Sequence, residues 1–202
     1  MSDLNEILEL ISDPKQQKAG LFKKTESVVL EFYLSGVLGP PEDYIDVFDA
    51  IRHLSARDTV KIYINTGGGD MYTCIQFLRV LSDTDAYVIC SVEGACMSAA
   101  TMIFLNADSF EVTPHSIFMF HNYSSGVYGK GGEQFDQVVH DRKWSKNLLE
   151  NIYEDFLTKD EINSLLANKD IWMDTEEVIV RMQKRIRIRE EMEELEKQTK
   201  PD

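Results

Sequence analysis

Short apolar runs alternate with stretches of helical periodicity along the first half of the chain. Strands are predicted for the runs rich in β-branched or aromatic residues, at 27–36, 59–64, 86–92 and 116–120. Helices are predicted where apolar residues recur at helical spacing between these runs, at 44–54, 71–81 and 95–105. The run at 86–92 is almost continuously apolar, which indicates a strand buried on both faces of a parallel sheet. Repeated strand-then-helix units therefore predict a right-handed α/β layer structure.

The second half of the chain is predicted to be mostly helical. Residues 126–132 are rich in glycine and are expected to be flexible, and a long stretch of helical periodicity follows at 133–157. A Thr-Lys-Asp-Glu sequence beginning at Thr158 is a capping box, which predicts another short helix. The stretch from Thr175 combines strong helix formers with dense mixed charge, so a final helix is expected there.

The N-terminal segment is predicted to be a short amphipathic helix and a linker. Apolar residues recur at helical spacing from Leu4 to Ile11, and Pro14 ends the pattern. This helix is expected to pack on its own domain or subunit, with a docking arm for a partner as the alternative. The chain is thus divided into the helix and linker at 1–25, a folded domain at 26–181 with a helical arm at about 122–160, and a charged helical tail at 182–202.

The charge balance narrows the range of partners. The 202 residues include 21 basic and 35 acidic side chains, a formal charge of -14. An acidic surface argues against sequence-independent nucleic-acid binding, which needs Lys and Arg to replace counterions, and against docking on an anionic membrane. The N-terminal sequence does not resemble a signal peptide, and no run reaches the roughly 18 apolar residues of a spanning helix. A cytoplasmic protein is expected.

The cysteine pattern predicts neither a disulfide framework nor a metal site. Cys74, Cys90 and Cys96 are odd in number, lie in apolar surroundings and form no C-x-x-C pair. No histidine cluster occurs at zinc spacing. Reduced cysteines in the core are therefore expected, and no metal or cofactor is predicted.

Three consecutive glycines, Gly67 to Gly69, follow the strand predicted at 59–64. Glycine permits positive φ, and a strand-to-helix turn exposes backbone N–H groups that can hold a phosphate or the oxyanion of an acyl-transfer intermediate. The sequence has neither G-x-G-x-x-G nor a following G-K-S or G-K-T, which argues against a nucleotide site. An oxyanion-binding turn and a plain tight turn both remain open.

Ser98 is the candidate nucleophile. It lies in a small apolar segment just after the buried strand and at the start of the next helix, where the helix dipole favours developing negative charge. The surrounding sequence is not the G-x-S-x-G elbow of α/β-hydrolases. For an isolated residue of this kind, a helical serine that bonds back to a carbonyl is the common alternative.

His121 and Asp170 are the candidate general base and orienting carboxylate. His121 ends the strand at 116–120, where it can face a cleft at the sheet edge, and imidazole suits base catalysis near neutral pH. Of the other histidines, His53 and His140 have charged helical neighbours, and His115 in a turn is the main competitor. Asp170 precedes Ile-Trp-Met, so a buried carboxylate that orients the histidine is expected, with a turn cap as the alternative.

Taken together, these segments resemble the Clp protease proteolytic subunit. Four motifs occur in the family's order and spacing from about 27 to 180, and they are Asn65-Thr66-Gly67-Gly68-Gly69, Gly94-Ala95-Cys96-Met97-Ser98-Ala99-Ala100, Ile117-Phe118-Met119-Phe120-His121 and Lys169-Asp170-Ile171-Trp172-Met173. The resemblance implies a Clp-protease/crotonase-like α/β fold of repeated β-β-α and β-α units with a protruding helical handle. It also implies a serine endopeptidase whose triad is Ser98, His121 and Asp170.

The resemblance carries further expectations. The N–H groups of Gly68 and Ala99 would form the oxyanion hole. Gly126, Val127, Tyr128 and Gly129 would bind the substrate, a peptide or unfolded protein, as an added β-strand. The long helix would be the handle that joins two rings, so a homo-oligomer of stacked rings is implied. A AAA+ unfoldase is the partner that such rings commonly have.

The sequence also departs from the family pattern. Gly67 stands where the family usually has proline, and Ala99-Ala100 stand in place of Met-Gly. Asn122-Tyr123 replace Gln-Pro, and the family's Tyr-Gly ending is absent, because residues after Ile179 continue into charged helix. These changes indicate a divergent member and weaken the inference of an unfoldase partner more than that of the triad.

Three alternatives remain open at this level. A catalytically inactive relative could keep the assembly as a scaffold. A crotonase-type acyl-CoA enzyme would use the glycine turn to hold a thioester enolate, but it does not need the Ser-His-Asp order. A Ser-Lys dyad could use Lys130 or Lys143.

Overall fold

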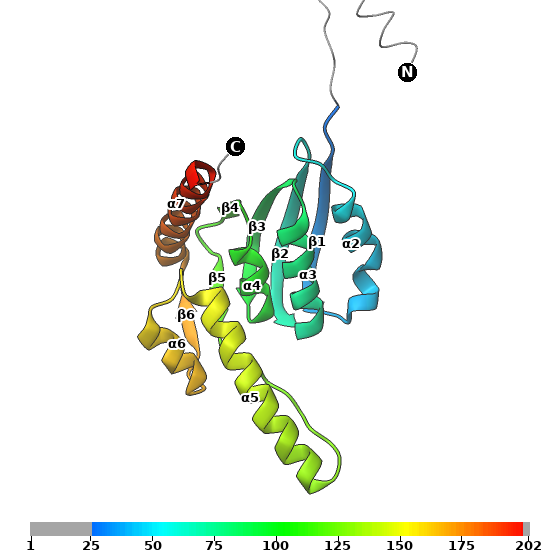
Figure 1. Ribbon diagram of the computed structural model, residues 1–202, viewed down its shortest axis with the longest axis vertical. Coiled ribbons are helices and arrows are strands. Elements are labelled where there is room, and N and C mark those ends of the chain that lie inside the picture. Colours follow the sequence, from blue (N-terminus) through cyan, green and yellow to red (C-terminus); the bar gives the residue numbers. More distant parts are fainter. Residues whose placement is uncertain (1–25, 200–202) are drawn as a thin grey trace, which may run out of the picture.

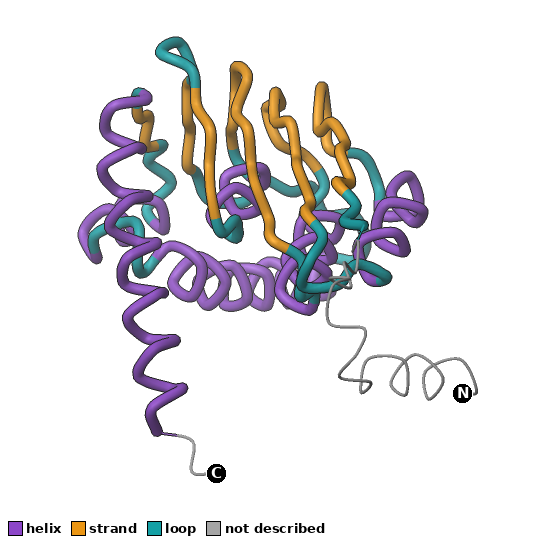
Figure 2. Tube along the Cα trace, turned by 90° about the horizontal axis from the view of Figure 1, so that it is seen from above, coloured by secondary structure: helices purple, strands orange, loops and turns teal. Residues whose placement is uncertain are grey.

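The computed structural model describes residues 26–199 and shows a six-stranded sheet with helices packed on one face (Figures 1 and 2). The N-terminal helix and linker expected at 1–25 lie outside the described residues. The strands are β1 (Val29–Leu38), β2 (Thr59–Gly69), β3 (Tyr87–Met97), β4 (Ser109–Val112), β5 (Ile117–Phe120) and β6 (Ile171–Met173). The helices are the 3-10 helix η1 (Pro41–Tyr44), α2 (Ile45–Arg52), α3 (Met71–Asp83), α4 (Ala99–Leu105), α5 (Gly131–Tyr153), α6 (Lys159–Leu166) and α7 (Thr175–Thr199).

The sheet confirms the predicted parallel α/β architecture. Its order is β1-β2-β3-β5-β6, with β4 also paired to β3. Every pairing is parallel except that of β5 with β6, which is antiparallel. The sequence analysis missed both β4 and β6, because strands of four and three residues are too short to show a period of two.

The order of helices along the chain agrees with the prediction, with one correction. The helix predicted from residue 95 begins at Ala99, because Ala95 to Met97 extend β3 and pair with β5. Sheet pairing therefore overrides the helical propensity of this alanine-containing segment. At the start of α3, the Asp70 side chain accepts from Thr73 N–H at 2.8 Å and so caps that helix.

The core lies between the sheet and the helices. Residues of β2 alternate, with Val60, Ile62 and Ile64 fully buried against the helices, while Lys61 and Tyr63 face the other side. Each such buried side chain contributes about 1.5–3 kcal/mol. The cysteines at 74, 90 and 96 are all free and buried in this core, as predicted. Burial raises the pKa of the Cys74 thiol to about 12 and also raises the pKa values of the other two.

Helix α5 forms the predicted arm and extends away from the body (Figure 1). Ser145, Leu149 and Tyr153, near its C-terminal end, are buried in the domain, whereas Phe135 and Val139 at its outer end are largely exposed. The arm is therefore anchored at one end only within a single chain.

Helix α7 is continuous across 181–182, the expected boundary between the domain and its tail. Arg181 binds both carboxylate oxygens of Glu161 on α6 at 2.7 and 2.8 Å, and Met182 is fully buried. The Arg185 guanidinium donates to the Leu105 carbonyl, which lies at the end of α4. The residues just after 181 thus pack on the domain itself.

We predict that the Arg181–Glu161 contact makes folding stability depend on acid pH. Bonding to Arg181 lowers the pKa of Glu161 from its ordinary value of 4.5 to about 2. A lowered pKa in the folded state adds stability that is fully present above pH about 4.5 and is lost as the pH falls toward about 2. Glu161→Gln should lower the free energy of unfolding by about 1–2 kcal/mol at pH 7, and the difference from wild type should shrink below pH 4.5 in urea titrations. The control is Glu150→Gln, which removes an exposed pair with Lys146. An equal effect of both variants at pH 7 would contradict the prediction.

Candidate active site

Ser98 is the single residue between the end of β3 and the start of α4. Its backbone has φ of 56° and ψ of -127°, and its N–H donates to the Met119 carbonyl of β5 at 2.8 Å. Positive φ is rare outside glycine and costs about 1–3 kcal/mol. Every residue of α4 is buried, so packing holds this costly turn in place.

His121 reaches Ser98 because two parallel strands end at the same edge of the sheet. Strand β5 pairs with β3 through Met97 and Met119, and each strand ends just before one of the two side chains. His121 Nε2 lies 2.6 Å from Ser98 Oγ, a short hydrogen bond. Of the competing histidines, His115 is exposed in its turn, and its backbone N–H donates to Thr113 Oγ1 at 3.3 Å.

Gly68 lies directly against Ser98. Its φ is +92°, and a Cβ added to it would be 2.7 Å from Ser98 Cβ and 3.1 Å from Ala99 N. The glycine turn expected after residue 64 is the end of β2, where the pairing with β3 shifts register. The Gly68 N–H donates to Thr66 Oγ1 at 3.0 Å, so it is already engaged in this structure. Ala99 is the first residue of α4, and its N–H has no partner within that helix.

Asp170 corrects one sequence-based expectation, because it is exposed rather than buried. It precedes the edge strand β6, and Asn168 turns the chain there with φ of 60°. Within residues 26–199, no hydrogen bond or ion pair joins Asp170 to His121. The two residues are nevertheless next to paired positions, since Phe120, which precedes His121, pairs with Ile171, which follows Asp170, in the antiparallel β5–β6 ladder.

The segment expected to bind substrate is a loop. Residues 121–130 connect β5 to α5 without regular secondary structure and run beside the helix (Figure 1). Gly129 C=O accepts from Gln134 on α5 at 2.7 Å, and Tyr128 is 97% exposed. The segment has no strand partner here, so its backbone remains available for pairing along most of its length.

A narrow pocket opens beside Ser98 and His121. Its walls include Met71 and Met102 from α3 and α4, and Trp144 with Leu148 from α5. The sequence analysis did not assign this role to α5. The apolar periodicity of that helix was the available signal, but periodicity alone does not show which cavity a helix lines.

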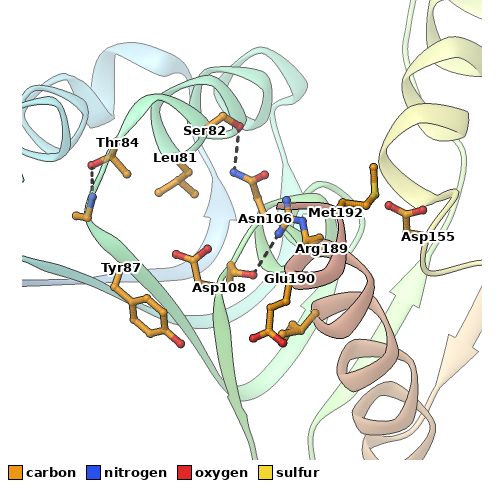
Figure 3. Close-up of a pocket in the computed structure, with 13 residues that line it drawn as sticks. Leu81, Ser82, Thr84, Tyr87, Asn106, Asp108, Asp155, Arg189, Glu190 and Met192 are labelled. Carbon is orange, nitrogen blue, oxygen red and sulfur yellow. Dashed lines mark hydrogen bonds between the residues drawn. The ribbon is translucent and has the colours of Figure 1, made fainter. Parts of the chain in front are cut away.

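A wider pocket lies elsewhere, between α7 and the ends of α3 and β3 (Figure 3). Its polar side chains mainly support the fold. Asp108 accepts from the Val88 N–H, Arg189 donates to the Ala107 carbonyl, and Asn106 donates to Ser82. Its lining contains no histidine or cysteine, so it does not offer the nucleophile-and-base pair seen at Ser98.

The described part of the chain contains neither a cluster of metal ligands nor a membrane-spanning helix. No three His, Cys, Asp or Glu side chains between residues 26 and 199 are grouped as ligands for a metal ion. No helix in the same range has the length and apolar character needed to cross a bilayer.

We predict that Gly68 cannot be replaced by alanine without disturbing Ser98. Gly68→Ala combines an unfavourable positive φ with contacts under 3 Å to Ser98 and Met97, and it should lower the free energy of unfolding by about 1–3 kcal/mol. Gly67→Ala is the matched control, because a Cβ at Gly67 would meet nothing within 4 Å. Denaturant titrations compare the two variants, and equal stabilities would refute the close packing described here.

Comparison with known proteins adds a finding that is independent of this geometry. The family model of the Clp protease matches residues 43–180, more than half of the chain. This range contains Ser98, His121 and Asp170. No curated protein gave a significant match. The parallel sheet and the protruding α5 agree with this match. The chain therefore belongs to the Clp protease family.

Proposed function

We propose that this protein is a serine endopeptidase that hydrolyses peptide bonds within an oligomeric chamber. The observation that carries the proposal is the 2.6 Å contact between Ser98 Oγ and His121 Nε2. A hydroxyl held against an imidazole can be deprotonated as it attacks, which makes it a nucleophile. The positive φ of Ser98 supports the same role, because strained backbone tends to persist at sites where function requires it.

The proposed reaction follows from this arrangement. His121 takes the proton of Ser98 Oγ as that oxygen attacks the peptide carbonyl carbon, and the N–H groups of Gly68 and Ala99 hold the resulting oxyanion. His121 then gives the proton to the departing amine, and water cleaves the acyl-enzyme. These steps need no metal or organic cofactor. The Gly68 N–H must turn away from Thr66 Oγ1 to take part.

Asp170 is proposed to orient His121 during these steps. Phe120 and Ile171, the chain neighbours of His121 and Asp170, are paired across antiparallel strands, and residues paired in this way have Cα atoms about 4.5–5.5 Å apart. Rotation of the Asp170 side chain toward the imidazole would then fix its tautomer and stabilise the imidazolium. Exposure of Asp170 leaves the side chain free to make this rotation.

The proposed substrate is an unfolded or extended peptide. The pocket of Met71, Met102, Trp144 and Leu148 lies next to Ser98 and has room for about one water molecule in this structure. An apolar side chain next to the bond to be cleaved would enter it only if these walls move apart. Segment 126–129 offers backbone groups to which a peptide can add as a strand, which is a common mode of peptide recognition.

Assembly into stacked rings is proposed on two grounds. Members of the Clp protease family typically form oligomeric rings and act on peptides. In this chain, Phe135, Val138 and Val139 on the outer part of α5 are 69%, 46% and 52% exposed, and large apolar residues grouped on a protruding helix suit a contact with a second copy. A AAA+ unfoldase remains the proposed supplier of substrate, on the family resemblance alone.

A catalytically inactive scaffold is the second candidate. Two observations favour it. The Gly68 N–H is engaged by Thr66, and the exposed Asp170 has no hydrogen bond or ion pair with His121 in the described part of the chain. A Ser-Lys dyad receives less support, since Lys130 pairs with Glu133 at the start of α5 and Lys143 does not line the Ser98 pocket. The crotonase-type alternative finds no specific support in the site.

We predict that Ser98→Ala abolishes peptidase turnover, with a loss on the order of 10⁴ to 10⁶ in kcat, because the nucleophile is removed. Turnover of a fluorogenic peptide is measured on a preparation of known native mass. A fluorophosphonate probe should label the wild type but not this variant. Ser91→Ala, a serine of β3 outside the pocket, is the control and should keep both signals. Wild-type turnover by Ser98→Ala would rule out the assignment, and an assembled wild type that is neither labelled nor active would favour the inactive scaffold.

We predict that Asp170→Asn lowers kcat on the order of 10⁴-fold, because an amide cannot stabilise the imidazolium as a carboxylate does. Asp85→Asn is the control. Asp85 is also an exposed aspartate, but it lies just before the start of β3, at the other end of that strand from Ser98. The kcat of Asp85→Asn should equal that of the wild type. Similar activities of the two variants would remove Asp170 from the proposed triad.

A further inference from the structure

A buried pair of hydroxyl groups connects the arm to the backbone of Ser98. Tyr153, the last residue of α5, and Thr101 on α4 are both fully buried. Thr101 Oγ1 lies 2.7 Å from the Tyr153 hydroxyl and 2.6 Å from the Ser98 carbonyl oxygen. These two residues are 52 positions apart in the sequence, and the proposed catalytic steps do not use either of them.

The direction of the two hydrogen bonds follows from their chemistry. A carbonyl oxygen only accepts, so the single proton of Thr101 is donated to Ser98. The Tyr153 hydroxyl must then donate to Thr101 Oγ1. Burial raises the pKa of Tyr153 well above its ordinary value, which keeps the phenol protonated and able to donate. The result is a directed chain from Tyr153 through Thr101 to Ser98, in which each bond polarises and strengthens the next.

The Ser98 carbonyl belongs to the same peptide group as the Ala99 N–H. A trans peptide is planar, and its C=O and N–H point in opposite directions. Anchoring the carbonyl on the side of Thr101 therefore fixes the Ala99 N–H on the other side. That side faces Gly68, since a Cβ on Gly68 would come within 3.1 Å of Ala99 N. The chain, together with the Thr101 backbone N–H that donates to the same oxygen at 3.0 Å, thus holds the direction of one proposed oxyanion donor.

Tyr153 also contacts the histidine side of the site. Its ring packs edge-on against Phe120, with centroids 5.6 Å apart, and Phe120 directly precedes His121. One residue at the base of α5 therefore supports both the serine turn and the strand that carries the proposed base.

We propose that Tyr153, acting through Thr101, is a positioning residue that holds the Ser98–Ala99 peptide in the orientation needed to bind the oxyanion. This inference rests on the proposed peptidase function. It adds a connection, separate from the pocket that α5 lines, by which displacement of α5 would disturb catalysis.

The test compares Thr101→Val, Thr101→Ser and Tyr153→Phe in the full chain. Removing an oxyanion donor outright costs about 10²–10³ in kcat. Loosening its orientation in Thr101→Val should therefore lower kcat by about ten- to a hundredfold. Tyr153→Phe should lower kcat less, because it keeps the Thr101–Ser98 bond. KM for a peptide should stay nearly constant, because the donor acts mainly in the transition state. Thr101→Ser keeps the hydroxyl and should restore most of kcat.

A double-mutant cycle separates the chain from independent packing effects. If Tyr153 acts through Thr101, adding Tyr153→Phe to Thr101→Val should cause little further loss of kcat. Thr175→Val removes another buried threonine hydroxyl that donates to backbone carbonyls, far along the chain from Ser98, and should leave kcat unchanged. Additive losses, a raised KM with unchanged kcat, or equal activity of Thr101→Val and Thr101→Ser would each overturn the proposal.

A crystal structure distinguishes failure of this inference from failure of the proposed function. The Ser98–Ala99 peptide should rotate in Thr101→Val and remain in place in Thr101→Ser. An unchanged peptide plane in Thr101→Val would overturn the positioning role even if the wild type is active. A wild type that lacks both turnover and probe labelling would instead overturn the peptidase function, and with it any catalytic role of the chain.

Discussion

The positive φ of Ser98 is the constraint on which the site depends, because it lets β3 turn into α4 through one residue. That turn sets the Ser98 side chain at the sheet edge where His121 follows the neighbouring strand. It is possible only because Gly68 leaves the space that a Cβ would fill. The strained backbone of Ser98, the absence of a Cβ at Gly68 and the alignment of the ends of β3 and β5 therefore depend on one another. A change in any one of them would disturb the other two.

Buried hydrogen bonds hold this arrangement from the helix side. Cys74 donates to the Ala99 carbonyl, and Thr101 donates to that of Ser98. The Thr101 backbone N–H donates to the same Ser98 carbonyl at 3.0 Å, so two bonds from one residue hold that oxygen. The backbone around the nucleophile is therefore fixed by α3, α4 and α5 together. In contrast, the side chain of Asp170 and most residues of the loop at 124–130 are exposed, and these are the parts that assembly or substrate can order.

The sequence was sufficient to predict most of the sheet and helix order, and to place Ser98 and His121 each just after a predicted strand. Strong periodicity explains this success. It could not predict β4 or β6, which are too short to show a pattern, or the start of α4, which is set by pairing of Ala95 to Met97 with β5. It also placed Asp170 in the interior on the strength of its apolar neighbours, although Trp172 itself is 55% exposed. The Thr101–Tyr153 bond joins distant positions and leaves no local signal.

The three buried cysteines have a consequence for chemical selectivity. Thiols react as thiolates, and the raised pKa values of Cys74, Cys90 and Cys96 leave almost no thiolate at neutral pH. Their burial also excludes reagents, so alkylation or oxidation of these side chains requires the fold to open. In the folded protein, an electrophile that modifies residues 26–199 therefore acts on groups other than sulfhydryls. Modification of a cysteine thiol instead measures how often the fold opens and exposes the core to solvent.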